Sequence, residues 1–291
     1  MQNRVKRVAA IHDISGFGRA SLTAIIPTLS AMGIQVCPVP TAILSNHTVG
    51  FPDYSYVDLT DTLEDFINHW KKLEIPFDGL YSGFLGSPRQ MAIVSDFFDS
   101  FKKDDNLIVV DPVMGDGGKL YSAFTTEIIP RMQELIKKAD LITPNYTEAA
   151  FLLGEAPDEA SFDMKKAKDW LKRLAEFGPE MTVITSAPLT EHPGEVSVVA
   201  YDKKQDVFWK IARTRIPASY PGTGDTFTAV LLGALLEGDP LPVALDRAGE
   251  FISQCIKASY SSDEPVRNGV LLEKELPLLR GTPSIGNYEK F

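Results

Sequence analysis

Short apolar runs rich in β-branched residues alternate with amphipathic helical stretches along most of the chain, and this alternation leaves few possible folds. Residues 5–11 are predicted as a buried strand, residues 20–32 as a helix that Gly33 ends, and residues 34–39 as a strand that Pro40 stops. Further strands are expected at residues 79–84, 107–110, 141–143 and 182–185, and further helices at residues 61–72, from Ser87 onward, 125–138, 147–153, 162–177 and 225–237. This order predicts a mostly parallel sheet with helices on both faces.

One pair of segments departs from that alternation. Residues 196–201 and 207–211, joined by the polar residues 202–206, are predicted as a small antiparallel hairpin at one edge of the sheet. No repeat, low-complexity segment or Gly/Ser linker divides the 291 residues. We therefore expect one α/β domain, a three-layer αβα sandwich over residues 1–258, with residues 259–291 as a C-terminal tail packed on the same domain.

The charge balance restricts the partners of the chain. With 29 Lys and Arg against 39 Asp and Glu, the net charge of −10 argues against binding to nucleic acids or anionic membranes. No apolar stretch approaches the ~20 residues of a membrane span. Cys37 and Cys255 form neither a disulfide framework nor a zinc motif, so a cytoplasmic protein is expected. An acidic chain that handles an anionic substrate needs backbone N–H groups, a few cations or Mg²⁺ beside it.

The segment Pro221-Gly222-Thr223-Gly224-Asp225 leads directly into an apolar helix. Glycines let the backbone approach a ligand closely, and a helix N-terminus directs free N–H groups at an anion. At the rim of such a phosphate site, Asp225 is placed to accept the proton of a hydroxyl that attacks a γ-phosphoryl group. The alternative is a glycine turn in which Asp225 is an ordinary N-cap.

Carboxylates also follow the predicted strand at residues 107–110. Asp111 and Asp116 flank a glycine-rich loop, and such a pair suits Mg²⁺, which needs only one or two carboxylates when nucleotide phosphates supply further ligands. After the next strand, Asn145 and Glu148 have the spacing of an N-cap and an N3 residue, and Glu148 is able to orient a Mg²⁺-bound water as well. The alternatives are an Asx turn for the first segment and a plain capping pair for the second.

Two further segments carry hydroxyl groups. Thr185 and Ser186 follow a predicted strand and offer their hydroxyls to a nucleotide. Residues 45–48 (Ser-Asn-His-Thr) place four hydrogen-bonding side chains in a row, a cluster able to recognise a polar heteroaromatic ring. The alternative for residues 45–48 is a turn that satisfies its own hydrogen bonds.

Several enzyme classes lack their motifs. The chain contains no Walker-type phosphate loop, no Gly-x-Ser-x-Gly elbow and no His-Glu-x-x-His. Gly16 and Gly18 follow the first strand as in a dinucleotide fingerprint, but Ser21 replaces the third glycine and no acid ends the second strand. These departures weaken the case for a dinucleotide site. Two hypotheses of other functional classes are kept: a nicotinamide-dependent oxidoreductase that uses Gly16 and Gly18, and a nucleotide-binding sensor without turnover.

Taken in this order, the segments resemble the ribokinase-like superfamily and, within it, the pyridoxal (vitamin B6) kinases, over roughly residues 5–257. The resemblance implies a ribokinase-like fold and ATP-dependent phosphorylation of the hydroxymethyl group of pyridoxal, pyridoxine or pyridoxamine. It also implies Mg²⁺, K⁺ as a further requirement, and a homodimer. The related hydroxymethylpyrimidine kinases share the Gly-x-Gly-Asp helix and are the nearest alternative, although their usual substrate loop lacks Ser-Asn-His-Thr.

The resemblance also implies roles for individual residues. Asp225 is the expected base, and Gly222, Thr223 and Gly224 are expected to stabilise the charge on the moving phosphoryl group. The residues assigned to ATP are Asp111, Tyr121, Asn145, Thr185, Ser186 and Thr223, and those assigned to Mg²⁺ are Asp111, Asp116 and Glu148. Lys119 and Arg19 are the candidate cations for the triphosphate, because both lie beside glycine loops.

The substrate ring is expected to meet Asp13, Ser45, His47, Thr48 and Phe84. Two of these residues depart from the better-known pattern, because Asp13 stands where many members carry serine and Phe84 where a tyrosine often stacks. A carboxylate at position 13 accepts hydrogen bonds only and so favours a ring that presents N–H or O–H donors. The preferred B6 vitamer stays open.

Overall fold

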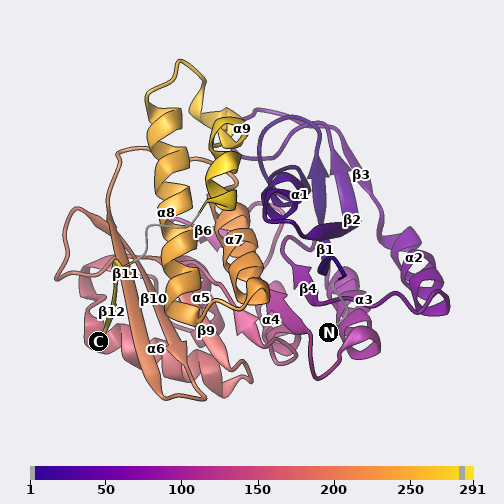
Figure 1. Cartoon of the computed structure of the whole chain (residues 1–291), viewed down its shortest axis with the longest axis horizontal. Helices are drawn as coiled ribbons and strands as arrows, with labels where there is room; N and C mark the ends of the chain where they lie inside the picture. Colours follow the sequence, from indigo (N-terminus) through magenta and orange to yellow (C-terminus); the bar gives the residue numbers. More distant parts are fainter. Residues whose placement is uncertain (1–3, 282–285) are drawn as a thin grey trace.

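The structure, a computed structural model, describes residues 4–281 and 286–291. Residues 1–3 of the expected domain and residues 282–285 of the expected tail lie outside the described residues. Among these described residues the main sheet has ten strands, and Figure 1 shows helices on either side of it. Their order across the sheet is β12 (Tyr288–Lys290), β11 (Val207–Thr214), β10 (Glu195–Asp202), β9 (Met181–Ala187), β8 (Leu141–Ile142), β5 (Leu107–Val110), β4 (Gly79–Ser82), β1 (Arg7–Ser15), β2 (Gln35–Leu44) and β3 (Tyr56–Asp58).

The interior of the sheet is parallel and its margins are antiparallel. Strands β2, β1, β4, β5, β8 and β9 pair in parallel, whereas β10, β11 and β12 extend one edge and β3 the other in antiparallel fashion. A second, two-stranded sheet consists of β6 (Gly115–Asp116) and β7 (Lys119–Leu120). The predicted α/β class, the mostly parallel sheet and the edge hairpin are confirmed.

Helices cover both faces of the sheet, as the strand pattern requires. Against one face lie α1 (Leu22–Ala31), α7 (Thr223–Glu237), α8 (Leu241–Tyr260) and α9 (Leu272–Glu275), and against the other lie α2 (Thr60–Lys72), α3 (Pro88–Phe101), α4 (Ile128–Ile136), α5 (Tyr146–Leu153) and α6 (Met164–Glu176). Short 3₁₀ turns are η1 (Glu159–Ser161), η2 (Val266–Asn268) and η3 (Leu276–Arg280). None of the helices in the described part of the chain combines the length and apolar character that a membrane crossing needs.

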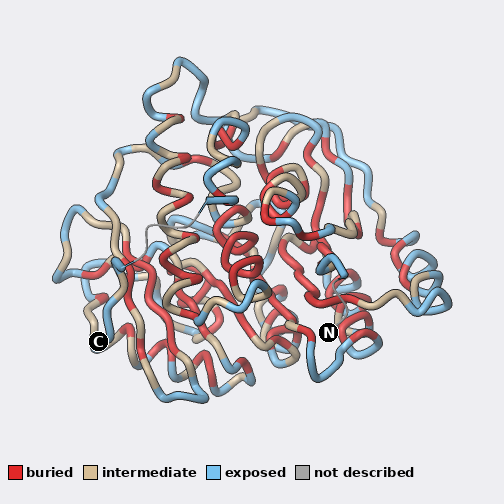
Figure 2. Tube along the Cα trace, in the orientation of Figure 1, coloured by how far each residue is buried: buried red, intermediate tan, exposed pale blue. Residues whose placement is uncertain are grey.

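One hydrophobic core lies on each face of the sheet, and alternate residues of a strand point into different cores. Along β1, Val8 and Ala10 face the helices α1, α7 and α8, whereas Ala9 and Ile11 face the opposite layer. Because both faces are covered, most residues of the central strands are buried, and every residue of β4 and β8 is. These strands are mostly red in Figure 2.

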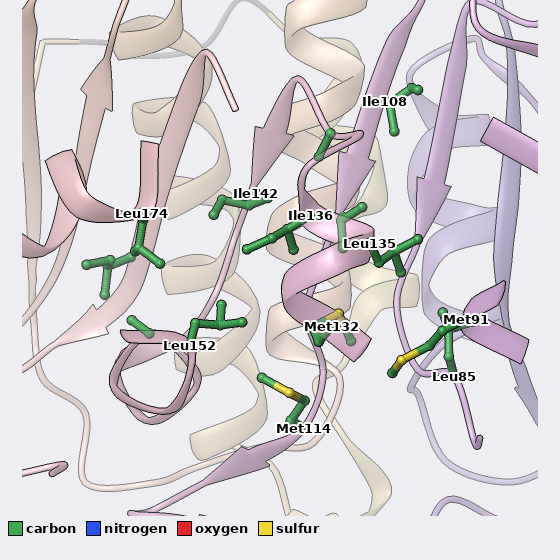
Figure 3. Packing of buried hydrophobic residues seen from close by; sticks show 14 of the residues in the cluster. Leu85, Met91, Ile108, Met114, Met132, Leu135, Ile136, Ile142, Leu152 and Leu174 are labelled. Carbon is green, nitrogen blue, oxygen red and sulfur yellow. The ribbon is translucent and has the colours of Figure 1, made fainter. Parts of the chain in front are cut away.

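Figure 3 shows from close by the core between the sheet and the helices α2 to α6. Met114, Met132, Ile136, Ile142 and Leu152 are fully buried there, so the loop that follows β5 is anchored to α4 and α5. Burying side chains of this kind contributes roughly 1.5–3 kcal/mol each. This packing fixes the loop that carries the expected metal ligands.

Two strand boundaries differ from the prediction. Strand β2 does not stop at Pro40; it runs to Leu44, and both Pro38 and Pro40 pair in register with β1. The prolines are tolerated because β3 pairs only with residues 42–44, which leaves this part of β2 at the edge of the sheet. Strand β1 likewise continues beyond the predicted end at Ile11 to Ser15, because the polar residues His12 and Asp13 are both buried.

The C-terminal quarter contains elements that the sequence pattern did not predict. Helix α8 was not predicted, and it packs against α7. It continues to Tyr260, past residue 258, where the boundary between domain and tail was expected. Within the described part of the tail, Val270, Leu272 and Leu279 are buried in the core. Strand β12 completes the sheet. The division at residue 258 stays a prediction, and the described tail contributes to the packing of the domain.

Candidate active site

A cleft of about 790 Å³ opens where the parallel strands end. Its walls come from the C-terminal ends of β1, β2, β4, β5, β8 and β9 and from the start of α7. The sequence-predicted residues among its lining are Asp13, His47, Thr48, Phe84, Asp111, Asp116, Tyr121, Asn145, Glu148, Thr185, Ser186, Gly222, Thr223, Gly224 and Asp225. The fold therefore brings together residues that lie more than 200 positions apart in the chain.

The start of α7 has the geometry of a phosphate cradle. Gly222 has φ 79°, and a side chain there would overlap the carbonyl oxygen of Arg19. Nothing lies within 4 Å of a Cβ added at Gly224, so this residue faces open space in the cleft. The Thr223 hydroxyl donates to the carbonyl of Tyr220 (3.1 Å). Glycine thus brings the backbone close to a ligand at the end of the helix where N–H groups are free.

Asp225 lies in the first turn of α7 with its side chain 16% exposed. Its Oδ2 accepts a hydrogen bond from the backbone N–H of Ser21 (2.7 Å), and its Oδ1 lies 3.9 Å from Nδ1 of His12. Burial raises the pKa of Asp225 to about 6, the Ser21 N–H opposes that rise, and the charge of Asp13 adds to it. A carboxylate with this pKa is suited to accept a proton near neutral pH.

Asp111 and Glu148 are both buried, with 6% and 3% of their surface exposed. Glu148 accepts hydrogen bonds from the backbone N–H groups of Asn145 (2.9 Å) and Met114 (3.0 Å), and Asn145 Oδ1 accepts one from the N–H of Glu148 (2.9 Å). The predicted capping box at the start of α5 is therefore formed. Burial raises the pKa of both carboxyl groups, and the charge of Glu148 raises that of Asp111 further.

This part of the cleft fits a divalent cation. Five carboxylates line the cleft, those of Asp13, Asp111, Asp116, Glu148 and Asp225, and no Lys or Arg of residues 4–281 and 286–291 lines it. Within the same ranges no group of three or more His, Cys, Asp or Glu side chains is arranged to hold a metal ion. A cation held by one or two carboxylates together with the phosphates of a nucleotide satisfies both observations.

Asp116 differs from the two buried acids. It is exposed in the short β6–β7 hairpin, and its Oδ1 accepts a hydrogen bond from the N–H of Gly117 (2.7 Å). The sequence offered an Asx turn as the alternative, but in an Asx turn the carboxylate accepts from the N–H two residues on, and here its partner is the next residue. The carboxylate also lines the cleft, so its assignment to Mg²⁺ stays a prediction.

The expected nucleotide side of the cleft carries neutral polar groups. Tyr121 is held by its backbone N–H, which donates to the carbonyl of Met114 (2.9 Å), and burial raises the pKa of its phenol above the usual range. The N–H of Thr185 donates to the carbonyl of Pro144 (2.9 Å), and Ser186 is exposed with φ 53°. These residues present hydroxyl groups to the cleft.

The other end of the cleft has the character of a ring-binding pocket. Asp13 Oδ1 accepts a hydrogen bond from the Ser21 hydroxyl (2.6 Å), and its Oδ2 accepts one from the Ser15 hydroxyl (3.2 Å). Phe84 packs against Phe124 with 5.4 Å between ring centroids and presents an aromatic surface to the cleft. Leu44, Thr48, Tyr54 and Tyr56 complete this end.

The segment at residues 45–48 is divided between the cleft and the surface. Ser45 is exposed and does not line the cleft, and its hydroxyl donates to Asn46 Oδ1 (2.9 Å). His47 lines the cleft, but its Nε2 lies 2.7 Å from the carbonyl of Arg267 and its Nδ1 accepts from the N–H of Val49 (3.2 Å). Both ring nitrogens are engaged within the protein, so His47 orients this loop, and Thr48 is the member that faces the cleft.

The geometry disfavours a dinucleotide site at Gly16 and Gly18. The N–H of Gly16 donates to the carbonyl of Leu44 (2.8 Å) and that of Arg19 to the carbonyl of Asn268 (3.1 Å). A pyrophosphate needs such N–H groups free. The Arg19 guanidinium pairs with Glu273 (2.9 Å) and Glu264 (3.2 Å) outside the cleft lining. Lys119 in β7 is also absent from the cleft lining, so its assignment to the triphosphate stays a prediction.

Two residues of the site were missed in the sequence. Ser21 contacts both Asp13 and Asp225, yet the sequence marked it only as a failed glycine position. His12 is fully buried beside Asp225, and neither of its ring nitrogens has a hydrogen-bond partner among the described residues. Ser21 reaches both carboxylates from a backbone with positive φ, and His12 lies within β1. Neither residue has a sequence signature.

The comparisons with known proteins agree with this geometry. The family model for phosphomethylpyrimidine kinase matches residues 16–268. A crystal structure named as a phosphomethylpyrimidine kinase of Bacteroides thetaiotaomicron, in an orthorhombic form with pyridoxal, is 50% identical, with a TM-score of 0.95, over 99% of this chain and 100% of that one. Pyridoxal kinase from Lactobacillus plantarum is 31% identical, with a TM-score of 0.86, over 95% and 97% of the two chains. Pyridoxal kinase of Arabidopsis thaliana is 29% identical over 85% of this chain and 78% of its own.

The fold and the cleft define a small-molecule kinase with ribokinase-like architecture. The chain belongs to the phosphomethylpyrimidine kinase family, and its resemblance to the pyridoxal kinases is confirmed.

Proposed function

We propose that this kinase transfers the γ-phosphoryl group of ATP to the hydroxymethyl group of a vitamin B6 vitamer. One observation carries the proposal. Asp225, with its pKa raised to about 6, lies beside the open backbone of Gly224 in a cleft that also contains a ring-binding end and two buried carboxylates. The residues proposed as base, phosphate cradle and substrate pocket thus line one cavity.

The reaction follows from this arrangement. Asp225 accepts the hydroxymethyl proton while the alcohol oxygen forms a bond to the γ-phosphorus and the bond between that phosphorus and the β–γ bridging oxygen breaks. ADP leaves with the electron pair of the broken bond, and the proton passes from Asp225 to solvent. Backbone N–H groups at Gly222, Thr223 and Gly224 donate to the phosphoryl oxygens as negative charge develops on them.

The acidic end of the cleft requires a cation for the nucleotide. Asp111 and Glu148 would hold Mg²⁺, with Asn145 orienting Glu148 and Asp116 at the rim. When bound, Mg²⁺ neutralises phosphate charge that these carboxylates would otherwise repel. Tyr121, Thr185, Ser186 and the hydroxyl of Thr223 supply polar contacts for ATP, and K⁺ is proposed as a second cation.

The substrate ring is assigned to the end of the cleft that contains Asp13, Thr48 and Phe84. Support for a B6 vitamer comes from the 50% identical Bacteroides thetaiotaomicron chain, whose structure holds pyridoxal. The aromatic surface of Phe84 packs on a flat ring, and the Asp13 carboxylate accepts hydrogen bonds from it. Ser45, which lies outside the cleft, is proposed to shape the loop.

A panel of alcohols tests the proposal. Pyridoxal, pyridoxamine, pyridoxine and hydroxymethylpyrimidine are supplied with MgATP, and ADP release and the phosphorylated product are both measured. A B6 vitamer with the highest kcat/KM supports the proposal; a clear preference for hydroxymethylpyrimidine would replace it with the second candidate, which the family description favours. ATP bound without turnover would indicate a sensor, and NADH binding an oxidoreductase.

Assembly and location complete the proposal. We propose a cytoplasmic homodimer, in keeping with the two free cysteines and the resemblance described above. Sedimentation equilibrium measures the assembly state directly. A monomer at micromolar concentration would contradict the homodimer and leave the catalytic assignment untouched.

A further inference from the structure

Ser21 joins the two ends of the cleft. Its hydroxyl donates to Oδ1 of Asp13 (2.6 Å), and its backbone N–H donates to Oδ2 of Asp225 (2.7 Å). The residue is itself buried, with 8% of its surface exposed. A single residue therefore holds both the carboxylate assigned to the substrate ring and the carboxylate assigned to the proton.

The backbone of Ser21 is in an unfavourable conformation for a serine. It has φ 52° and ψ −136°, a region that residues with a side chain rarely adopt. In this conformation Ser21 forms a bridge to Ile14 of β1, which places it between β1 and α7. The strain is sustained by the contacts that Ser21 makes on either side.

The Ser21 side chain does not form the hydrogen bond that is usual at its position in the helix. It is the N-cap of α1, where a serine side chain normally accepts a hydrogen bond from the first turn of the helix, yet no such bond is formed. The hydroxyl instead donates to Asp13. Local helix stability therefore accounts neither for the side-chain orientation nor for the backbone angle, whereas contact with the two carboxylates accounts for both.

We propose that Ser21 is a positioning residue that couples recognition of the substrate ring by Asp13 to the orientation of the base Asp225. The proposal rests on the function proposed above. Its Oγ–H keeps Oδ1 of Asp13 directed across the cleft, so the substrate edge that meets Asp13 presents an N–H or O–H donor. The same residue then fixes Asp225, so a ring bound correctly on Asp13 has its hydroxymethyl group aligned with the base.

Charged and titratable groups from several elements face this pair of carboxylates. His12 of β1 lies beside Asp225, the Tyr81 phenol of β4 lies 3.5 Å from the Asp225 carbonyl, and Asp111 follows β5. His47 lies close enough to Asp13 for their charges to interact. Ser21→Ala removes the hydroxyl that donates to Asp13 and keeps the backbone N–H that donates to Asp225. None of these neighbouring groups is altered, so the substitution isolates the hydrogen bond to Asp13.

A double-mutant cycle tests the coupling. Ser21→Ala, Asp13→Asn and the double variant are compared for kcat and KM toward pyridoxal and for pyridoxal affinity without ATP, measured by calorimetry. Ser21→Ala is expected to weaken pyridoxal binding about tenfold, the effect of roughly one hydrogen bond to a charged group. The KM for ATP should be unchanged. In the Asp13→Asn background the same substitution should have little further effect on pyridoxal affinity.

The control is Thr28→Val, which removes a buried hydroxyl that donates to Ala24 within the same helix and lies outside the cleft lining. It should leave both KM values at the wild-type level. Additive effects of Ser21→Ala and Asp13→Asn on pyridoxal affinity would overturn the coupling, as would an equal rise in the KM for ATP. Failure of the wild-type enzyme to phosphorylate any B6 vitamer would instead reject the proposed function.

Ser21→Gly separates the strain from the hydroxyl. Glycine adopts positive φ without cost and keeps the N–H toward Asp225. It should bind pyridoxal as weakly as the alanine variant and show a lower kcat, because the backbone that orients the base is no longer held in one conformation. A glycine variant with wild-type affinity for pyridoxal would overturn the role of the hydroxyl.

Discussion

As the proposed base, Asp225 accepts a proton only in its ionised form, so its environment is expected to set the pH dependence of the reaction. Its pKa is raised from 3.8 to about 6, chiefly by burial. Below that pKa the carboxyl is protonated, and kcat/KM should fall about tenfold for each further pH unit. Asp225→Asn should lower kcat by roughly 100- to 10,000-fold, with ATP affinity retained. Near-normal turnover in the Asn variant would remove Asp225 from the base role.

The same residue should limit stability. A carboxyl whose pKa is higher in the folded chain binds more protons there than when unfolded, so stability falls as pH rises from 3.8 to about 6. Asp225→Asn removes this loss. Urea unfolding at pH 7 should therefore show the inactive variant to be at least as stable as the wild type, which distinguishes lost chemistry from lost folding.

His12 gives a second prediction at the scale of one residue. A methyl group added at Gly83 would overlap the imidazole of His12, which lies beside Asp225. Gly83→Ala should therefore destabilise the protein by about 1–3 kcal/mol and reduce kcat, since the displaced ring is a direct neighbour of Asp225. Removing the ring with His12→Ala should make Gly83→Ala nearly neutral in urea unfolding. Equal cost in both backgrounds would exclude this contact as the cause.

At the scale of elements, the first turn of α7 separates stability from activity. A methyl group at Gly224 meets nothing within 4 Å, so Gly224→Ala should raise stability by up to about 1 kcal/mol, the helix-propensity difference. The same methyl occupies the space proposed for the phosphoryl group and should lower kcat strongly. Gly222→Ala should lose both stability and activity, because its side chain overlaps the Arg19 carbonyl and its φ is 79°. A fully active Gly224→Ala variant would place the phosphoryl group elsewhere.

The elements also show what the sequence could predict. Local signals were sufficient where they act locally: Ser87 and Pro88 begin α3 as expected, and Asn145 begins α5. The position of most site residues followed from the rule that ligands bind beyond the strand ends. Tertiary context decided the rest. Prolines in β2 are tolerated only because most of that strand lies at an edge, and the role of Ser21 depends on a backbone angle that no residue type specifies.

At the scale of the whole molecule, the negative charge of the chain and of the cleft opposes the binding of an anionic nucleotide. The net charge is −10, and the cleft is lined by carboxylates, with no Lys or Arg from the described ranges. ATP without a divalent cation should therefore bind at least tenfold more weakly than MgATP, and chelation should abolish turnover. Asp111→Asn should lose activity, and its affinity for metal-free ATP should exceed that of the wild type increasingly as pH rises, because the raised pKa of Asp111 is then passed and the substitution removes one repelling charge from the cleft.

The salt dependence of ATP affinity tests this field independently of catalysis. Raising the ionic strength from 0.01 to 0.15 M shortens the screening length from about 30 to about 8 Å. With a chelator present, added tetramethylammonium chloride should therefore strengthen the binding of ATP, since it screens repulsion and does not substitute for K⁺. A cleft that attracted the triphosphate through Lys or Arg would respond in the opposite direction. Weaker binding at higher salt would thus show that cations of this chain, Lys119 first among them, govern the nucleotide in place of a metal ion.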